Sequence, residues 1–276
     1  MGYGLEYYGP SQTLIGVNIQ AKQCDYSVVL ELVRDPENFD VEEIFERLIA
    51  NHVEGIVCCI PSIGSNMDAI SDYARQIQQP FIFTDYQSVP DLSVIEMDNF
   101  LGGQLATEHL LAQGHRAVAI ITGLPSYFSA QERVRGWRAA MLRHGLEPDE
   151  HLMAEGDWTA ASGARAIEQI LAQRPDVTAL FAGNDQMALG SIYYASNHGL
   201  RIPDDLAIVG YDDIPEAAFF SPSLTSVRQN LISLGAQAVM DVIKQVEHKS
   251  SSGSEAPLHR LIPPELTIRQ SSMRRR

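Results

Sequence analysis

The stretch VTALFAGNDQMALG, residues 177–190, contains the unit that repeats along this chain of 276 residues. Its apolar run, 177–181, has the pattern of a buried strand, and a helical pattern begins a few residues later. Asn184 and Asp185 place an amide and a carboxylate side by side where the chain leaves the strand. We expect Asp185 to cap the following helix, which leaves Asn184 without that explanation.

Similar apolar runs occur at residues 13–17, 27–33, 55–60, 80–85, 117–123 and 206–213. Helical patterns lie between them, at residues 41–51, 66–78, 102–113, 130–144, 160–173, 186–198 and 231–249. Apolar strands that alternate with helices are typical of parallel sheets covered on both faces. We therefore predict an α/β fold with two doubly wound parallel-sheet subdomains.

The chain order suggests how the two subdomains are divided. We assign residues 13–97 and 231–256 to the N-terminal subdomain and residues 98–230 and 257–270 to the C-terminal subdomain. Residues 1–12 are expected to be a linker or a non-native remnant, and residues 271–276 a tail. Pro263 and Pro264 restrict the last extended run, 259–270, to the edge of a sheet.

The connection between the first two apolar runs is unusually short. Residues 21–25 alone separate LIGVNIQ from YSVVLEL, whereas a parallel crossover needs about a dozen residues. We expect either a break in the chain near Gln20 and Ala21 or a distorted first unit.

Composition excludes several classes of protein. The formal net charge of −15 disfavours a surface that binds nucleic acid. The N-terminal residues lack the basic and apolar regions of a signal peptide, and no apolar run approaches the ~18–20 residues of a membrane span. Cys24, Cys58 and Cys59 form neither a disulfide framework nor a metal spacing. We expect a cytoplasmic protein with no metal and no cofactor.

Several polar residues follow the predicted strands, where open parallel sheets bind their ligands. These are Asp85, Asn184 and Asp212, with Arg133 in the helix after residues 117–123. Asp213 follows Asp212, and Trp158 stands in the stretch GDWTAASG. Taken singly, Asp213 could be a helix cap, Arg133 a surface or ion-pair residue, and Trp158 a core residue. Together they supply a rigid donor fork, hydroxyl acceptors and an aromatic wall, which suit a polyol.

Enzymatic signatures are weak. The sequence contains no nucleophile elbow, no phosphate-binding P-loop and no dinucleotide fingerprint. His109 and His115 are six residues apart, which does not place them on one helix face. We therefore expect a binding protein and not an enzyme.

The chain resembles the LacI/GalR family of transcriptional regulators. The stretches that carry the resemblance are DNFLGGQLATEHLLAQGHR, SAQERVRGW, EGDWTAASG, NDQMALGS, AIVGYDD and SPSLTSVRQN, in family order over residues 12–270. The resemblance implies two subdomains of the periplasmic-binding-protein type, joined by three crossovers, with a sugar-like effector between them. It implies the following ligand-binding residues: Asp85, Ser129, Arg133, Trp158, Asn184, Asp212 and Gln229.

The resemblance also implies an assembly. Phe219 and Phe220 stand next to each other in a loop, and the family places its dimer contact here. We predict a homodimer, without the heptad segment that would make a tetramer. Because no helix-turn-helix precedes Ser11 in this sequence, operator DNA is expected to be bound only through a domain absent from this chain. The alternatives are a solute-binding protein of the same fold, for transport or sensing, and an enzyme.

Overall fold

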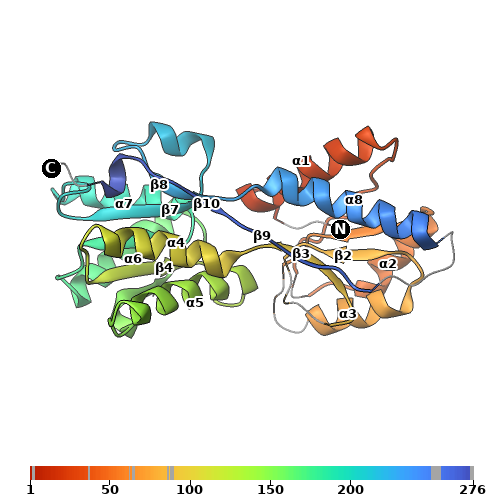
Figure 1. Ribbon diagram of the computed structural model, residues 1–276, viewed down its shortest axis with the longest axis horizontal. Helices are drawn as coiled ribbons and strands as arrows, with labels where there is room; N and C mark the ends of the chain where they lie inside the picture. The colour runs from red at the N-terminus through yellow and green to blue at the C-terminus, as the bar shows by residue number, and fades with distance from the viewer. Residues whose placement is uncertain are drawn as a thin grey trace. The chain divides into compact units, whose positions relative to one another are not determined.

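The computed structural model describes residues 1–276 except 2–3, 37, 62, 64–65, 86, 88–89, 250–255 and 274–276. The chain divides into two compact units. Unit 1 comprises Met1–Met97 and Asn230–Ile262, and unit 2 comprises Asp98–Gln229 and Pro263–Arg276. Each unit has a largely parallel sheet with helices packed on it, so the predicted fold class is confirmed (Figure 1).

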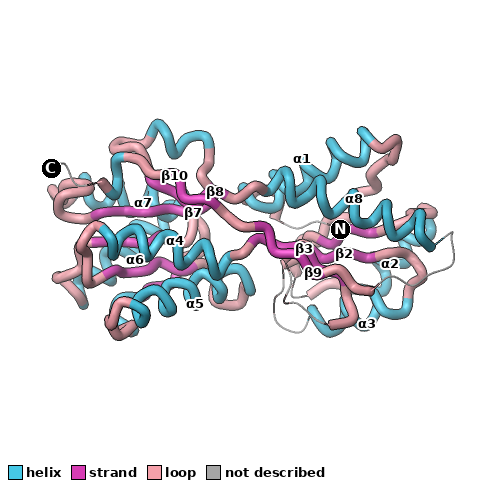
Figure 2. The backbone as a smooth tube through the Cα atoms, viewed as in Figure 1, coloured by secondary structure: helices cyan, strands magenta, loops and turns pink. Residues whose placement is uncertain are grey.

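Unit 1 contains a sheet of four parallel strands in the order β1-β2-β3-β9. These strands are β1 (Ile56–Cys58), β2 (Phe81–Phe83), β3 (Ser93–Met97) and β9 (His259–Ile262). Its helices are α1 (Tyr8–Gln23), α2 (Val41–Ala50), α3 (Asn66–Gln76) and α8 (Leu231–Lys249). Figure 2 shows the strands in magenta between these helices.

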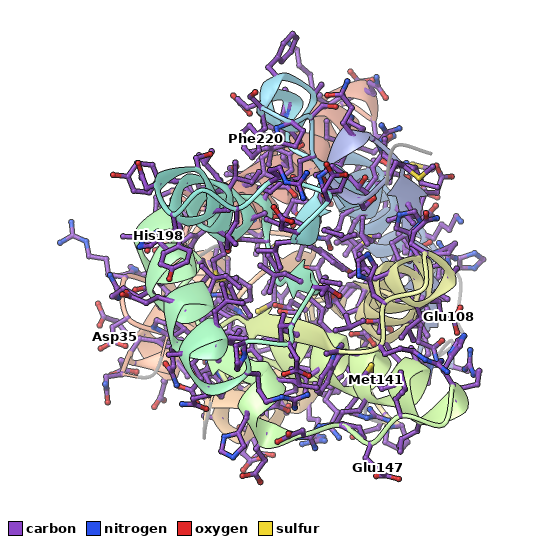
Figure 3. The ribbon with its side chains drawn as sticks, turned by 90° about the vertical axis from the view of Figure 1, so that its left-hand side faces the viewer. Asp35, Glu108, Met141, Glu147, His198 and Phe220 are labelled. Atoms are coloured by element: carbon purple, nitrogen blue, oxygen red, sulfur yellow. The ribbon has the colours of Figure 1, made fainter. Side chains whose placement is uncertain are left out.

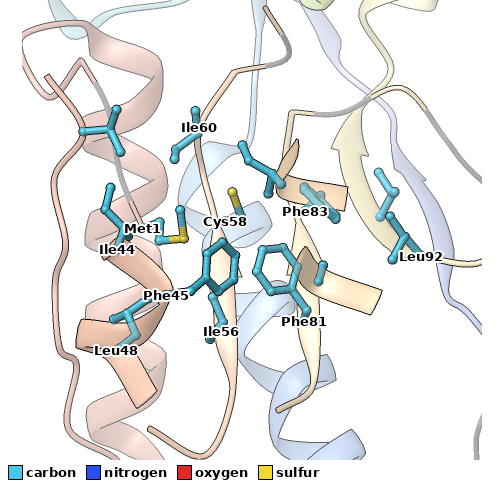
Figure 4. Packing of buried hydrophobic residues seen from close by; sticks show 14 residues of the cluster. Met1, Ile44, Phe45, Leu48, Ile56, Cys58, Ile60, Phe81, Phe83 and Leu92 are labelled. Atoms are coloured by element: carbon cyan, nitrogen blue, oxygen red, sulfur yellow. The ribbon is translucent and has the colours of Figure 1, made fainter. Parts of the chain in front are cut away.

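Alternate strand residues pack on opposite faces of this sheet. Phe81 and Phe83 join a cluster with Phe45 of α2 and Cys58 (Figure 4). Ile82, between them, packs with α8 residues such as Leu234 on the other face. The predicted two-sided cover of a parallel sheet is thus present in unit 1. Cys58 is buried, and Cys24 and Cys59 are half-buried free thiols.

The predicted strand at residues 13–17 is wrong, because these residues lie within helix α1. Tertiary packing explains the difference: α1 runs along α8 with its backbone in close contact. A Cβ on Gly16 would overlap the carbonyl oxygen of Ile232, and a Cβ on Gly235 would overlap that of Thr13. Two glycines therefore allow a helix–helix approach that a run of apolar letters does not reveal.

The predicted strand at residues 27–33 is also wrong. The segment is extended with a single bridge residue, Leu32, and joins neither sheet. Val28, Val29, Leu30 and Leu32 are 38–49% exposed. For this region we expected either a chain break near Gln20 and Ala21 or a distorted first strand–helix–strand motif. The chain continues without a break through α1, and residues 13–33 contain no such motif, so the second outcome is found.

Three predicted boundaries are corrected. Residues 1–12 are not a linker: the Met1 ammonium donates to the Val57 carbonyl at 2.9 Å, and α1 begins at Tyr8. Residues 257–262 belong to unit 1, because β9 pairs with β3. The tail begins after Ser272, because Ser271 and Ser272 are fully buried and the Ser271 hydroxyl donates to the Ile208 carbonyl at 2.6 Å.

Unit 2 has a sheet in the order β10-β8-β7-β6-β4-β5, parallel except for β10. Its strands are β4 (Val118–Thr122), β5 (Met153–Glu155), β6 (Ala179–Ala182), β7 (Ala207–Asp212), β8 (Thr225–Arg228) and β10 (Glu265–Thr267). Its helices are α4 (Asn99–Ala112), α5 (Phe128–Arg143), α6 (Ala160–Gln173) and α7 (Asp185–Asn197), with short 3-10 segments η1 (Glu150–Leu152), η2 (Pro215–Phe219) and η3 (Gln270–Ser272). Helix α4 packs on α5, and α6 packs on α7.

Pro263 and Pro264 separate β9 from β10, and each of these strands lies at an edge of its sheet, as predicted. Strands β3, β5 and β8 were not predicted. The strand order of the unit 2 sheet reverses between β4 and β6. Strand β5 lies on one side of β4, whereas β6, β7 and β8 lie on the other. Such a switch point is where open α/β sheets bind ligands.

Candidate functional site

Five strands of unit 2 end on the same side of its sheet, because β4, β5, β6, β7 and β8 are parallel. We call the residues at and just after these strand ends the unit 2 rim: 123–127, 156–159, 183–185, 212–214 and 228–229, together with Arg133 of α5. The rim includes four of the predicted site residues besides Arg133: Trp158, Asn184, Asp212 and Gln229.

Arg133 is buried, with 8% of its surface exposed. Its Nε donates to Asn99 Oδ1 at 2.9 Å, and its Nη1 donates to the Gly183 carbonyl at 2.6 Å. The second bond joins α5, which follows β4, to the end of β6, and therefore spans the switch point. A surface position, the alternative expected for a lone arginine, is excluded.

Two residues that the sequence analysis did not select hold Arg133. The Tyr211 ring centroid lies 3.7 Å from the guanidinium carbon, and the Tyr211 hydroxyl donates to Asn99 Oδ1 at 3.1 Å. Burial raises the pKa of Tyr211 to about 12, so the hydroxyl stays protonated. Polar residues beside the strand-end motif, Tyr in IVGYDD and Asn in MDNF, were the available signal.

Asn184, and not Asp185, is the N-cap of α7, which corrects the prediction. Asn184 Oδ1 accepts from the Met187 amide at 2.8 Å, and Asn184 Nδ2 donates to the Trp158 carbonyl at 3.0 Å. Asp185 is fully buried and accepts instead from the Ile214 amide at 2.8 Å and from the Ser226 hydroxyl at 2.6 Å. Burial and the charge of Asp212 hold the pKa of Asp185 well above its ordinary value.

The turn at residues 212–214 is held in an unusual backbone conformation. Asp212 and Asp213 have φ angles of 105° and 54°, a region that side chains other than glycine rarely occupy. Asp213 is not a helix cap. Its carboxylate pairs with Arg228 at 2.7 Å and Arg269 at 2.6 Å. Burial alone would raise the pKa of Asp213, but these partners outweigh it and leave the pKa below its ordinary value.

Asp212, the last residue of β7, is buried, with 7% of its surface exposed. Its Oδ1 accepts from Gln229 Nε2 at 2.6 Å. Burial raises its pKa to about 6, against the opposing effects of the Arg133 charge and the Gln229 hydrogen bond. Within the described residues, no ion pair of 4.0 Å or less joins Arg133 and Asp212, although each side chain is buried.

Trp158 is half-buried, so it is not a full core residue. A Cβ on Gly123 would overlap the six-membered ring of its indole, which therefore lies directly over the chain after β4. Trp158 itself has a φ of 70°, and the Arg133 guanidinium carbon lies 5.7 Å from its ring centroid. The indole therefore lies at the rim beside Arg133, and its role as a wall for a ring ligand stays a prediction.

The remaining predicted residues are placed elsewhere. Ser129 is half-buried in the first turn of α5, and Asp85 follows β2 in unit 1. Phe219 is 86% exposed at the end of η2, and Phe220 is half-buried. Figure 3 labels Phe220 on this part of unit 2, apart from the helices that carry Glu108 and Met141. The two phenylalanines are therefore not both core residues.

The two histidines that the sequence analysis considered, His109 and His115, each lie within hydrogen-bond distance of a hydroxyl group. His109 Nε2 lies 2.8 Å from Ser272 Oγ, and His115 Nδ1 lies 2.8 Å from Thr178 Oγ1. Among the described residues, no group of three or more His, Cys, Asp and Glu side chains could hold a metal ion. None of the described helices is long and apolar enough to span a membrane. Chemically, the rim offers buried donors, buried acceptors and an aromatic wall.

Comparison with known proteins agrees with this geometry. A periplasmic binding protein-like domain matches residues 107–272. The HTH-type transcriptional repressor PurR of Haemophilus influenzae is 34% identical over 86% of this chain and 69% of that protein. The lactose operon repressor of Escherichia coli is 31% identical over 98% of this chain and 72% of that protein. The chain belongs to the LacI family of transcriptional regulators.

Solved structures of LacI-family proteins share the fold. The lac repressor dimer bound to operator and the anti-inducer ONPF has a TM-score of 0.85 and 29% identity, over 99% of this chain and 92% of that chain. A complex of the transcriptional regulator CelR with cellobiose has a TM-score of 0.84 and 28% identity, over 95% of this chain and 78% of that chain. The chain corresponds to the effector-binding core of a LacI-family repressor.

Proposed function

We propose that the unit 2 rim binds the ring of a sugar-like effector and so controls operator binding by a LacI-type repressor. The residues proposed to contact the effector from unit 2 are Ser129, Arg133, Trp158, Asn184, Asp212 and Gln229. For Asp85, which follows β2 in unit 1, the effector contact implied by the family resemblance stays a prediction. Binding would shift the population between two conformations of the core, by an amount set by the difference in effector affinity between them.

The relation between Arg133 and Asp212 carries this proposal. Both side chains are buried: Asp212 ends β7, and Arg133 of α5 donates to Gly183 at the end of β6, the neighbouring strand. The charge of Arg133 lowers the pKa of Asp212. Yet, for these two described residues, no ion pair of 4.0 Å or less forms. Arg133 Nη2 and the second carboxylate oxygen of Asp212 therefore remain as a donor and an acceptor for hydroxyl groups, beside the indole of Trp158.

Calorimetric titration with sugars tests the proposal, after a thermal-shift screen has identified a binding sugar. A ligand at 100 times its dissociation constant adds about 2.7 kcal/mol to stability, which a melting scan resolves. Arg133→Ala should then weaken binding by about ten- to a hundredfold, because a hydrogen bond to a charged group contributes about 1.5–3 kcal/mol.

Arg135→Ala is the matched control for this experiment. Arg135 lies on the same helix, and its side chain is 66% exposed and paired with Glu132. Its removal should leave sugar affinity unchanged. Equal affinities of the Arg133→Ala protein and the parent chain would contradict the proposed use of the rim.

We also propose that the core forms a two-fold homodimer through the face that carries Phe219. Exposed apolar side chains support this proposal: Phe219 is 86% exposed, Tyr193 67% and Leu189 40%. The lac repressor in the structure described above is a dimer. Phe219→Asp should shift the sedimentation coefficient toward that of a monomer, and a parent chain that is monomeric at tens of micromolar would refute the contact.

We propose further that this chain acts as a cytoplasmic regulator and not as an enzyme. Its relatives are transcriptional repressors, and one related structure is bound to operator. Hydrolysis of a nitrophenyl glycoside by the purified chain, abolished by Asp212→Asn, would contradict this part of the proposal.

A further inference from the structure

The charges of the unit 2 rim restrict the class of sugar that it can accept. Its ionisable side chains are the acids Asp157, Asp185, Asp212 and Asp213 and the bases Arg133 and Arg228. Both bases are engaged within the protein. Arg228 pairs with Asp213 at 2.7 Å, and Arg133 donates to Asn99 and Gly183.

Arg133 has little capacity left for an anion. Two of its three nitrogens have acceptors, and its face rests on the Tyr211 ring. A phosphate group is recognised well by the paired nitrogens of an arginine fork, and the pair of Nε with Nη2 is interrupted here by Asn99 Oδ1. One free nitrogen can donate to a hydroxyl but cannot form the two parallel bonds that a phosphate favours.

The Asp212 carboxylate, which within the described residues is not paired with Arg133, adds a repulsive contribution. Asp212 is buried, so its charge is weakly screened, and a dianionic phosphate beside it would place like charges together. The start of helix α7 does not favour an anion either, because the Asn184 side chain accepts from the Met187 amide and Asp185 places a carboxyl group in the first turn. Helix α5 begins without a side-chain cap, but the partial charge of a helix end, about half a unit, is smaller than the carboxylate charge that it would have to offset.

We infer that the effector is an uncharged sugar and that the rim discriminates against sugar phosphates. The inference rests on the proposed sugar-binding function and specifies its ligand class. The discriminating group is the Asp212 carboxylate, with Arg133 held in a form that donates to hydroxyls. Hydroxyl groups of a neutral ring can donate to Asp212 and accept from Arg133 without an excess of charge.

The test compares two series of sugars on the parent chain by calorimetry. The neutral series is glucose, galactose and cellobiose, and the charged series is glucose 6-phosphate and galactose 6-phosphate, with inorganic phosphate as the salt control. We expect a neutral monosaccharide to bind, and its 6-phosphate to bind more weakly, on the order of tenfold or more. A 6-phosphate that binds as tightly as its neutral counterpart, or more tightly, would overturn the inference and leave the proposed sugar site standing.

A different result would affect the proposed function itself. If neither series binds and the melting temperature is unchanged at high sugar concentration, the sugar function is refuted together with the inference. Binding of the phosphorylated series thus distinguishes failure of the inference about charge, in which it binds, from failure of the proposed sugar function, in which neither series binds.

The Asp212→Asn variant locates the discrimination. Asparagine also tolerates a φ above zero, so the turn should be retained, which the melting temperature checks. The ratio of neutral to phosphorylated affinity should fall by about tenfold when the charge is removed. Asp204→Asn is the matched control, because Asp204 is an exposed acid of unit 2 that lies near Arg201. A ratio that is the same in Asp212→Asn and the parent chain would show that Asp212 does not discriminate.

Discussion

The guanidinium of Arg133 rests 3.7 Å from the centroid of the Tyr211 ring, and both side chains donate to the same oxygen of Asn99. Arg133 of α5, Tyr211 of β7 and Asn99 of α4 therefore form one buried cluster at the rim. A cation over a desolvated aromatic face is stabilised by about 2 kcal/mol. Tyr211 is a positioning residue, because it acts on a ligand through Arg133.

Substitution of Tyr211 separates the ring from the hydroxyl. Tyr211→Phe keeps the ring and should lower the unfolding free energy by about 1 kcal/mol, through the lost hydrogen bond. Tyr211→Leu removes the ring and should also reduce sugar affinity by about tenfold. Denaturant titration and calorimetry measure the two effects.

Phe181→Leu is the control for the Tyr211 variants. Phe181 is fully buried, and its ring lies 6.2 Å from that of Tyr211. The Phe181→Leu protein should be less stable than the parent and keep the parent's affinity for the sugar. Equal sugar affinities of Tyr211→Leu and Tyr211→Phe would show that the ring does not position Arg133.

Asn184 combines a helix cap with a tether to Trp158, and two substitutions distinguish these roles. Asn184→Asp keeps an oxygen for the Met187 amide and loses the donor to the Trp158 carbonyl. It should retain the stability of the parent within about 0.5 kcal/mol, while sugar affinity falls. Asn184→Ala loses both of these bonds and the one from Nδ2 to Gln186 Oε1, and should lower stability by about 1 kcal/mol. An Asn184→Asp protein with the parent's sugar affinity would exclude the tether as a binding determinant.

The raised pKa of Asp212 predicts a pH dependence. In the folded chain this pKa is about 6 because the group is buried, whereas in an unfolded chain aspartate titrates near pH ~4. Between these values the folded state holds a proton that the unfolded state has lost. The unfolding free energy should therefore fall as the pH rises through this window, by up to about 3 kcal/mol from this group, and level off above it.

Asp212→Asn isolates this contribution from that of Asp185, whose pKa is raised in the same direction. The variant should match the parent near pH 4 and exceed it in stability at pH 7.5. Urea denaturation at the two pH values measures the difference. Stability curves of variant and parent that run parallel across this range would contradict the assigned pKa shift.

Much of unit 2 follows from the letters of the sequence, because three of its parallel strands and its four long helices have clear patterns, whereas the short strands β5 and β8 do not. The same patterns place Asn184 and Asp212 at strand ends and Arg133 in the helix that follows a strand. The roles of Asn99 and Tyr211 do not follow, because they depend on how α4, α5 and β7 pack together. Likewise, Asn184 and Asp185 both suit a helix cap. The choice between them depends on the turn at Asp212, which recruits Asp185 through the Ile214 amide.

The error at residues 13–17 has a similar origin. A short apolar run with Thr, Ile and Val fits a buried strand and a packed helix equally well. What decides between them is the partner surface on α8, far away in sequence. Gly16 is the residue that makes this partner accessible, and its substitution tests the assignment of α1.

Gly16→Ala and Gly9→Ala should have opposite effects on stability. Both glycines lie in α1, so alanine favours the helix at each position by about 0.5–1 kcal/mol. At Gly9 nothing lies within 4 Å of an added Cβ, and the unfolding free energy should rise by that amount. At Gly16 the added Cβ meets the backbone of Ile232, which cannot move without displacing α8, so the net loss should be about 1–3 kcal/mol. Chemical denaturation of the three proteins provides the measurement. A Gly16→Ala protein as stable as Gly9→Ala would mean that α1 does not pack on α8 through this residue, and that residues 13–17 adopt another structure in the folded chain.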